Sequence, residues 1–432
     1  MHPCHQPAKD IAKLTDSTEK KQHFTVLGAG IVGLCCAVSL QRSGFPVTLV
    51  DRLDPGTGTS FGNAGLIQID SVVPIATPGI IRSVPRMLLD PMGPLVVRSR
   101  YLHRIAPWLV RFILSARPER VEQISFALAS LLDRANEAWL ELIAAANAQD
   151  VWRQSGELHV YRTKEAWHSS RASDELRRRR GSGLEELTVE EMRQLEPALS
   201  PSLYRGVFTP NANSITHPLH LSQKLFDLFR HNGGEFKKAN ITGIELKPDG
   251  EPGSLMTEYG ALPIGGLVIA AGAFSKNFAK SIGISVPLDT ERGYHLWLPN
   301  PGIEMRRPII VGDHKFGIVP MTGGIRLAGT VEFGGLKLAP DWRRADILAE
   351  LAKPFVPELR TDGAEQWMGY RPSMPDSLPV IGRSPHKKNV FLAFGHGHLG
   401  LTMGAVTGQV IAALARGDRL EFDLLPFRAD RF

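Results

Sequence analysis

A glycine motif near the start of the chain constrains the fold more than any other feature. Residues 28–33 read Gly-Ala-Gly-Ile-Val-Gly between a short apolar stretch and an apolar helical pattern. Gly28 permits a tight turn after a strand, Gly30 lets the backbone approach a pyrophosphate, and Gly33 lets the helix pack against the strand. Free N–H groups at the start of that helix then face the two phosphates.

An acidic residue completes this unit. A second apolar stretch, residues 47–50, ends at Asp51. In dinucleotide-binding folds, an acid about 20 residues beyond the last glycine accepts hydrogen bonds from ribose hydroxyls. The sequence therefore predicts a Rossmann-type α/β unit that binds an adenine dinucleotide. The alternative is a glycine-rich turn without a ligand.

Two later segments favour FAD over NAD. Residues 268–272 (VIAAG) form an apolar strand that ends in small residues, which suits close packing behind a long cofactor. Residues 395–400 (GHGHLG) precede a helix expected to begin at Thr402, whose N–H groups can face flavin ring oxygens. These segments predict cofactor contacts from Gly28, Gly30, Ile31, Val32, Gly33, Asp51, Arg52, Gly272, Gly397, His398, Leu399, Gly400, Leu401 and Thr402.

Composition excludes several classes of protein. The 432 residues carry a net charge of +6 and suit two or three globular domains. Neither zinc-finger spacing nor a basic-aromatic stripe is present, so no nucleic-acid partner is expected. The three cysteines, Cys4, Cys35 and Cys36, show no disulfide or metal-binding pattern, which favours a reducing cytoplasm. Residues 1–22 form a polar extension without the apolar segment of a signal peptide.

Longer motifs resemble a known family. The chain resembles the D-amino-acid oxidase superfamily of FAD-dependent amine oxidoreductases, and it is similar to the bacterial D-amino-acid dehydrogenase small-subunit branch. Within that branch it looks closest to glyphosate oxidoreductases, through DTERGYH at 289–295 and LLDPMGPL at 88–95. The other matching stretches are VLGAGIVG at 26–33, TSFGNAG at 59–65, GTVE at 329–332, GYRPSMPDSLPVIG at 369–382 and FGHGHLGLT at 394–402.

The resemblance implies a fold and a reaction. It implies a Rossmann-type FAD domain and a substrate domain with a large antiparallel β-sheet. We expect the FAD domain at residues 23–78, 212–284 and 368–432, and the substrate domain at 79–211 and 285–367. A hydride would pass from the α-carbon of an amino acid to flavin N5, and the imine would hydrolyse to an oxo acid and an amine or ammonia. The matching loop adds cofactor contacts from Ser60, Asn63, Ala64 and Gly65.

The substrate is expected to be a small anionic amino acid held by arginine. A guanidinium binds a carboxylate through two parallel hydrogen bonds, and Arg371 matches the family's carboxylate arginine; the alternative is a structural pair with Asp376. Tyr294 is expected to add a second hydrogen bond, the alternative being a core tyrosine whose hydroxyl is already bonded. Arg292 is a further candidate for binding an anion.

Other polar residues leave alternatives open. Lys315 and Glu332 could face the cavity or be exposed or ion-paired. No catalytic base is nominated, because an amine in a less polar pocket can bind in its neutral form. His396 and His398 lie on a glycine-rich turn, which predicts a position beside the flavin for them and not a role as metal ligands. No residue stands out as an attachment point, so FAD is expected to bind non-covalently.

The chain has two arginine-rich segments, of which the first bears on the electron acceptor, expected to be oxygen or a quinone. Residues 79–117 mix arginines with apolar residues, which predicts either peripheral contact with the inner face of a membrane or a surface with solvated arginines. Arg177–Arg180 are expected to form a solvated helix end rather than a nucleic-acid site. The alternative functions are a secondary-amine or imino-acid oxidase of the sarcosine or hydroxyproline type, a non-catalytic FAD-holding subunit, and an NAD-dependent dehydrogenase.

Overall fold

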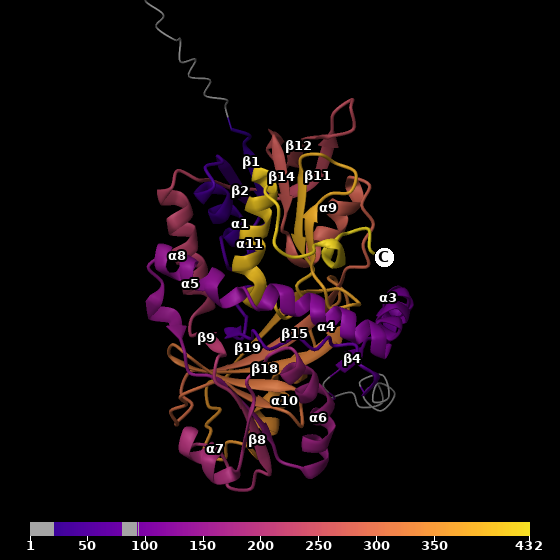
Figure 1. Ribbon diagram of the computed structural model, residues 1–432. Helices are drawn as coiled ribbons and strands as arrows, with labels where there is room; N and C mark the ends of the chain where they lie inside the picture. Colours follow the sequence, from indigo (N-terminus) through magenta and orange to yellow (C-terminus); the bar gives the residue numbers. More distant parts are fainter. Residues whose placement is uncertain (1–20, 80–92, 94) are drawn as a thin grey trace, which may run out of the picture.

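The computed structural model describes residues 21–79, 93 and 95–432, and it contains two main sheets, one above the other in Figure 1. The predicted polar extension lies outside the described residues except for its last two. The first sheet has six strands, parallel except at its last pair. Their order is β10 (Glu235–Lys238), β2 (Val47–Asp51), β1 (Phe24–Leu27), β14 (Gly266–Ile269), β21 (Val390–Phe394) and β20 (Val380–Arg383).

Both faces of this parallel sheet are covered, which explains why its strands are continuous apolar runs. Val26 faces a core formed with α1 (Ile31–Arg42), α8 (Pro218–His231) and α11 (Gly400–Arg416). Leu27 faces a second core on the other side of the sheet. That side holds η3 (Gly272–Phe274), α9 (Ser275–Ser281), β11 (Ile241–Leu246), β12 (Pro252–Thr257) and β13 (Gly260–Pro263).

Two helices that were assigned to the substrate domain pack on this first unit instead. Residues of α4 (Pro118–Leu132) and α5 (Ala135–Ala145) share the core of α1 and α11. The indole of Trp139 donates hydrogen bonds of 2.9 and 3.1 Å to the carbonyls of Leu401 and Thr402. The prediction that residues 79–211 belong to the substrate domain is therefore wrong for α4 and α5, because an apolar helix face does not specify which sheet it covers.

The second sheet has nine strands and is mostly antiparallel, as the family resemblance implies. Its parallel pairs are β16–β6 and β18–β4. The strand order is β19 (Glu365–Ser373), β15 (Asp289–Leu298), β18 (Gly324–Phe333), β17 (Phe316–Met321), β16 (Ile309–Val311), β6 (Glu157–Tyr161), β8 (Arg205–Thr209) and β7 (Glu185–Leu187), with β4 (Leu95–Val97) beside β18.

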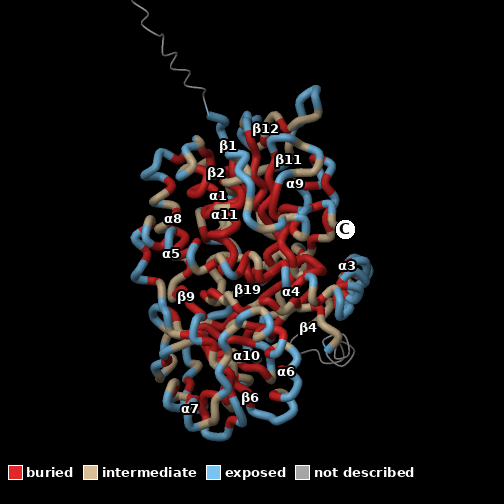
Figure 2. The backbone as a smooth tube through the Cα atoms, in the orientation of Figure 1, coloured by how far each residue is buried: buried red, intermediate tan, exposed pale blue. Residues whose placement is uncertain are grey.

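The predicted boundary at residue 368 falls inside β19, which pairs with β15 along its whole length. The chain passes directly from this strand into the C-terminal part of the first unit, and Figure 2 shows buried residues continuing through that junction. The remaining described elements are α3 (Leu102–Ser115), α6 (Lys164–Arg179), α7 (Val189–Leu195), α10 (Arg343–Ala352), β3 (Leu66–Ile67), β5 (Trp152–Arg153), β9 (Asn213–Ile215), η1 (Ser99–Tyr101), η2 (Gln149–Val151) and η4 (Leu425–Phe427).

The arginine run at the end of α6 corrects a further expectation. Arg177 is buried and forms ion pairs with Asp70 and Asp174. Arg178 pairs with Glu186, and Arg179 and Arg180 both pair with Glu122. The run is thus not simply a solvated helix end, because one member neutralises buried carboxylates. No helix in the described parts of the chain has the length and hydropathy that a bilayer span requires.

Candidate active site

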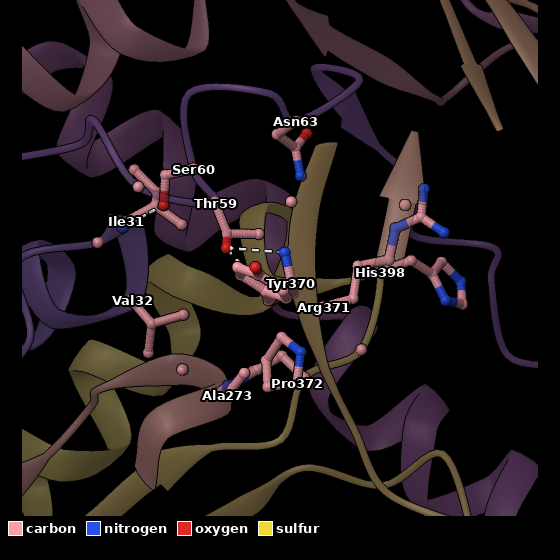
Figure 3. Close-up of a pocket in the computed structure, with 18 of the residues that line it drawn as sticks. Ile31, Val32, Thr59, Ser60, Asn63, Ala273, Tyr370, Arg371, Pro372 and His398 are labelled. Atoms are coloured by element: carbon pink, nitrogen blue, oxygen red, sulfur yellow. Dashed lines mark hydrogen bonds between the residues drawn. The ribbon is translucent and has the colours of Figure 1, made fainter. Parts of the chain in front are cut away.

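A cavity of about 870 Å³ lies where the two sheets meet. Its walls come from the β1–α1 turn, the end of β2, the 58–64 loop, η3, the central strands of the second sheet and residues 396–401. Most of the predicted contacts line it: Gly28, Gly30, Ile31, Val32, Asp51, Arg52, Ser60, Asn63, Ala64, Gly272, Arg371, Tyr294, Gly397, His398, Gly400 and Leu401. Segments far apart in the sequence therefore meet around one space, part of which is drawn in Figure 3.

The glycine motif shapes one end of the cavity. A Cβ atom on Gly33 would lie 1.8 Å from the carbonyl oxygen of Gly28, so only glycine lets α1 approach the turn this closely. Helix α1 has no side-chain cap at Gly30, and the N–H of Ile31 donates to Ser60 Oγ at 2.9 Å. Helix N–H groups and a hydroxyl facing a cavity are the donor set that a pyrophosphate requires.

Asp51 stands at the end of β2 beside this turn. Its carboxylate accepts the N–H of Ala29 at 2.7 Å and the N–H of Leu53 at 2.9 Å, which fixes both oxygens. Each oxygen keeps a lone pair for a ribose hydroxyl. The neighbouring Arg52 guanidinium lies 4.3 Å from the centre of the Phe274 ring, so it stacks on another wall residue.

Four predicted contacts do not line the cavity: Gly33, Gly65, Leu399 and Thr402. Helix α11 begins at Gly400, two residues before the predicted start, which turns Thr402 inward. The Thr402 hydroxyl accepts the N–H of Gln68 and donates to the carbonyl of Leu66. Leu399 packs in the core, while Gly65 approaches the backbone of Ile215. These four residues therefore pack behind the residues that line the cavity and do not contact the cavity themselves.

The 58–64 loop is held against the second sheet. Thr59 Oγ1 accepts the N–H of Tyr370 at 3.3 Å and donates to the carbonyl of the same residue at 3.2 Å, as Figure 3 shows in part. Arg326 on β18 donates to the carbonyls of Phe61 and Asn63. The loop is therefore fixed by residues of the strands that line the other end of the cavity.

Alternating residues of two paired strands form that other end. In the β15–β19 register, Glu291 faces Arg371, Gly293 faces Gly369 and His295 faces Trp367. All six line the cavity, because side chains two residues apart share one face of a sheet. The rings of His295 and Trp367 stack with centroids 4.8 Å apart. The space over each glycine of the central pair is taken by a neighbouring side chain: Arg371 lies over Gly293, and Trp367 lies over Gly369, where an added Cβ would come within 2.1 Å of the indole ring.

Arg371 is the cation at this end. Its guanidinium lies over Gly293, where an added Cβ would come within 2.5 Å of Cζ. It forms no hydrogen bond or ion pair with any residue that the structure describes. The alternative pair with Asp376 is wrong, because Asp376 binds Arg431 at 2.8 and 3.1 Å. Burial lowers the pKa of Arg371, but arginine stays charged at neutral pH.

The other candidates around Tyr294 have partners already. The Tyr294 hydroxyl donates to Glu332 at 3.2 Å and accepts the N–H of Asp341 at 3.0 Å, which is the alternative of a bonded core tyrosine. Arg292 pairs with Glu332 at 3.0 Å and donates to three carbonyls, those of Gly335, Leu338 and Ala339. Neither Arg292 nor Glu332 lines the cavity, so neither is available to a ligand there.

Histidines and a lysine complete the wall. His396 is buried and its Nε2 lies 3.0 Å from Thr407 Oγ1. His398 lines the cavity near Arg371 (Figure 3), and burial, with the arginine, lowers its pKa to about 4. Burial lowers the pKa of His295 to about 3, and its Nδ1 donates to the carbonyl of Gly62. Lys315 also lines the cavity, and its ammonium contacts no described hydrogen-bond partner.

Sequence reasoning missed Glu291, His295 and Trp367. The first two belong to the DTERGYH motif and alternate with Arg292 and Tyr294. A period of two places residues 291, 293 and 295 on one face, and that signal was present in the sequence. Which face lines the cavity depends on pairing with β19, 72 to 80 residues later, which the motif does not contain.

Comparison with known proteins identifies the family. The family described as "FAD dependent oxidoreductase" matches residues 23–414. The chain belongs to this FAD-dependent oxidoreductase family. It is 38% identical to a D-amino-acid oxidase of Bradyrhizobium diazoefficiens, over 95% of this chain and 99% of the relative. It is 29% identical to a D-amino acid dehydrogenase of Vibrio vulnificus, over 92% and 96% of the two chains.

A solved structure shares the fold of this FAD-dependent oxidoreductase. Iminodiacetate oxidase from a Chelativorans species superposes with a TM-score of 0.71 at 19% identity, over 94% of this chain and 98% of the other. FAD is the cofactor of the family, and the residues here fit it: uncapped helix N–H groups, a carboxylate at the end of β2 and a cavity that continues to the second sheet. Residues 28–32, 51–52 and 60–64 would hold the dinucleotide part.

Proposed function

We propose that this protein oxidises the C–N bond of an amino acid, with Arg371 binding the substrate carboxylate. The observation that carries the proposal is the Arg371 guanidinium, which lines the cavity, lies over Gly293 and has no hydrogen-bond or ion-pair partner among the described residues. A buried cation without a partner is costly, and a bidentate carboxylate would relieve that cost. The names of the two relatives support an amino-acid substrate.

We propose a separate role for each part of the cavity. When bound, FAD supplies a hydride acceptor, flavin N5. Arg371 would fix the substrate carboxylate, and the small residues Gly293 and Gly369 give room to the Arg371 guanidinium and the Trp367 ring. His295 and Trp367 would bound the side-chain end and exclude water. Water entering afterwards would hydrolyse the imine to an oxo acid and an amine or ammonia.

A second candidate is an N-substituted glycine such as glyphosate, or another substrate with a second anionic group. Lys315 favours it, because this ammonium lines the same cavity without a described partner. Burial lowers the pKa of Lys315, while Asp313 and Asp174 act in the opposite direction and favour its charged form.

For the electron acceptor we propose oxygen or a quinone reached at the inner face of a membrane. Helix α3 supports the quinone alternative, since it exposes Leu102, Val110, Ile113 and Leu114 together with Arg104 and Arg111. An apolar face flanked by arginines is suited to an anionic lipid surface. Co-sedimentation with vesicles of anionic lipid should retain the wild-type chain and lose the variant Val110→Asp/Ile113→Asp. Equal binding of both would refute this surface.

The test of the main proposal is anaerobic reduction of the bound flavin. Purified protein should be yellow, and at least one of glycine, D-alanine, sarcosine, D-proline or glyphosate should bleach it. The variant Arg371→Gln should keep its flavin but require a substrate concentration raised by about 100-fold, from the loss of charge-assisted hydrogen bonds worth about 3 kcal/mol. A folded protein that takes up no flavin, or an Arg371→Gln variant with unchanged kcat/KM, would overturn the proposal.

A further inference from the structure

Glu291 is a buried carboxylate that the proposed reaction has not used. It lies in β15 with 4% of its surface exposed, and it lines the cavity. The Ser373 hydroxyl donates to its Oε1 at 2.5 Å. Its Oε2 has no hydrogen-bond partner in the described part of the chain. A carboxylate buried in this way, with one oxygen facing a cavity, needs a donor from a ligand.

The strand register places this oxygen beside the site proposed for the substrate carboxylate. Glu291 and Arg371 are directly opposite each other in the antiparallel β15–β19 pair, where Cβ atoms lie about 5 Å apart on the same face of the sheet. They form no direct ion pair, although the charge of Arg371 acts on Glu291. The cation of Arg371 and the anion of Glu291 thus lie side by side, and each has polar atoms without a hydrogen-bond partner in the described part of the chain.

From this juxtaposition we infer that Glu291 binds the substrate's amino group and accepts a proton from it, while Arg371 holds the carboxylate. The inference rests on the proposed amino-acid oxidation. An amino acid in neutral water carries an ammonium and a carboxylate on one carbon, a few ångströms apart, and the two strands present the complementary charges at a similar spacing. A simple carboxylate ligand would satisfy only Arg371.

The proton balance of the reaction gives such a group a role when the substrate binds as its ammonium form. An ammonium has no lone pair to assist departure of a hydride, so one N–H proton must leave before oxidation. Transfer of that proton to Glu291 breaks an N–H bond and forms an O–H bond, giving a neutral amine and a neutral carboxyl group. The α-C–H pair of electrons can then leave as hydride, and the resulting iminium is hydrolysed. No oxidant beyond the family's FAD is needed.

The neighbouring charges suit this role. Burial raises the pKa of Glu291, and the charge of Asp289 on the same strand raises it further; the Ser373 hydrogen bond and Arg371 oppose these effects. Asp289 itself accepts a hydrogen bond from Tyr101. From the C-terminal turn, His398 stays neutral at pH 7 because its pKa is lowered to about 4. The carboxylate is therefore the proton acceptor that this end of the cavity offers.

The first test compares pH profiles of kcat/KM for the holoenzyme and the variant Glu291→Gln, with the fastest substrate of the panel above. Wild type should show a plateau below the pKa of the substrate's own ammonium, because the enzyme takes the proton after binding. The variant must capture the rare neutral amine from solution, so its kcat/KM should rise about tenfold per pH unit over the same range. At pH 7 it should be at least about 100-fold below wild type. Glu291→Asp should restore part of the plateau.

The second test measures binding, and its readout is independent of turnover. Propionate has the carboxylate of D-alanine without its amine, and its binding to the holoenzyme can be followed by perturbation of the flavin spectrum. Glu291→Gln should bind propionate as tightly as wild type or more tightly, because a negative neighbour is removed. The Arg371→Gln variant should bind it more weakly. Weaker binding of propionate by Glu291→Gln would indicate a damaged cavity and count against the assignment.

The outcomes separate the two proposals. If wild type oxidises amino acids but Glu291→Gln keeps the wild-type plateau, Glu291 is not the proton acceptor and the inference fails alone. A parallel loss of kcat/KM at every pH, without a change in slope, would likewise reduce Glu291 to a structural residue. If no amino acid bleaches the wild-type flavin, the proposed function fails.

Discussion

Adding one methyl group at Gly293 should disable substrate binding while leaving the fold intact. The new Cβ would lie 2.5 Å from both Cζ and Nη2 of Arg371 and 2.6 Å from its Nε. Ordinary contacts begin at about 3.4 Å, so the guanidinium must move by about 1 Å. The displaced atoms are the end of a flexible side chain, and Gly293 has an ordinary extended backbone that alanine can adopt. The free-energy cost of the substitution therefore falls on substrate binding by Arg371 and not on the folding of the chain.

The magnitude follows from that displacement. A misplacement of about 1 Å at a group that positions substrate can cost about 100-fold in rate, which corresponds to about 2.7 kcal/mol of transition-state stabilisation. We expect Gly293→Ala to keep its flavin content and to unfold within about 2 °C of wild type. Its kcat/KM should fall about 100-fold, and its affinity for propionate should fall with it.

The assay needs a matched glycine. Gly243 lies in β11, where an added Cβ would meet nothing within 4 Å, so Gly243→Ala should behave as wild type in every measurement. If Gly293→Ala retained kcat/KM within threefold of wild type, Arg371 would not need its place over Gly293. An equal fall in thermal stability and activity would show instead that the glycine serves the fold.

Three further predictions concern the cofactor end and the core. Gly33→Ala places a Cβ 1.8 Å from the Gly28 carbonyl, so the purified variant should carry less than a tenth of the wild-type flavin, measured by visible absorbance per protein; an undiminished flavin content would contradict the close-packing argument. Burial lowers the pKa of His396 to about 3, against 6.5 for the unperturbed side chain. Because the unfolded chain binds more protons between these values, stability should fall as pH drops below 6.5; at pH 5 this residue should cost about 2 kcal/mol. Urea unfolding at pH 7 and 5 should show a smaller loss in His396→Asn, and an identical loss would refute that origin. Arg177→Ala should destabilise the fold by about 3 kcal/mol because it leaves Asp70 and Asp174 buried without their cation. The exposed Arg179→Ala should cost less than about 1 kcal/mol, and equal thermal shifts would show that burial is not what matters.

The cofactor end was readable from the sequence because its signals are local. Turn glycines, a helix start and an acid at the end of the next strand all fall within residues 24–51, and the structure places them together. The motif around Arg371 was equally visible. The pattern around Thr402 did not show that the helix begins two residues earlier, at Gly400. This shift turns the Thr402 hydroxyl away from the cavity and toward Gln68.

The substrate end was harder because its geometry depends on pairing between distant segments. The motif favours Tyr294 and Arg292, but Arg292 does not line the cavity and the Tyr294 hydroxyl already has two partners, whereas the alternate residues Glu291 and His295 line the cavity. The choice between the two faces of a strand is decided by what packs on each, and α10 covers the other face with residues such as Leu348. The same reason explains the misplacement of α4 and α5: periodicity shows that a helix has an apolar face, not which sheet receives it.

Strand β19 gives the molecule a mechanical property. Arg371, which we propose to bind the substrate carboxylate, directly follows Tyr370, whose N–H and carbonyl both form hydrogen bonds with Thr59 in the 58–64 loop. A displacement of Arg371 is therefore transmitted to the 58–64 loop through the peptide unit that joins residues 370 and 371. Grafting a foreign substrate sheet onto this cofactor domain would succeed only if the graft stops before β19 or brings a compatible 58–64 loop with it.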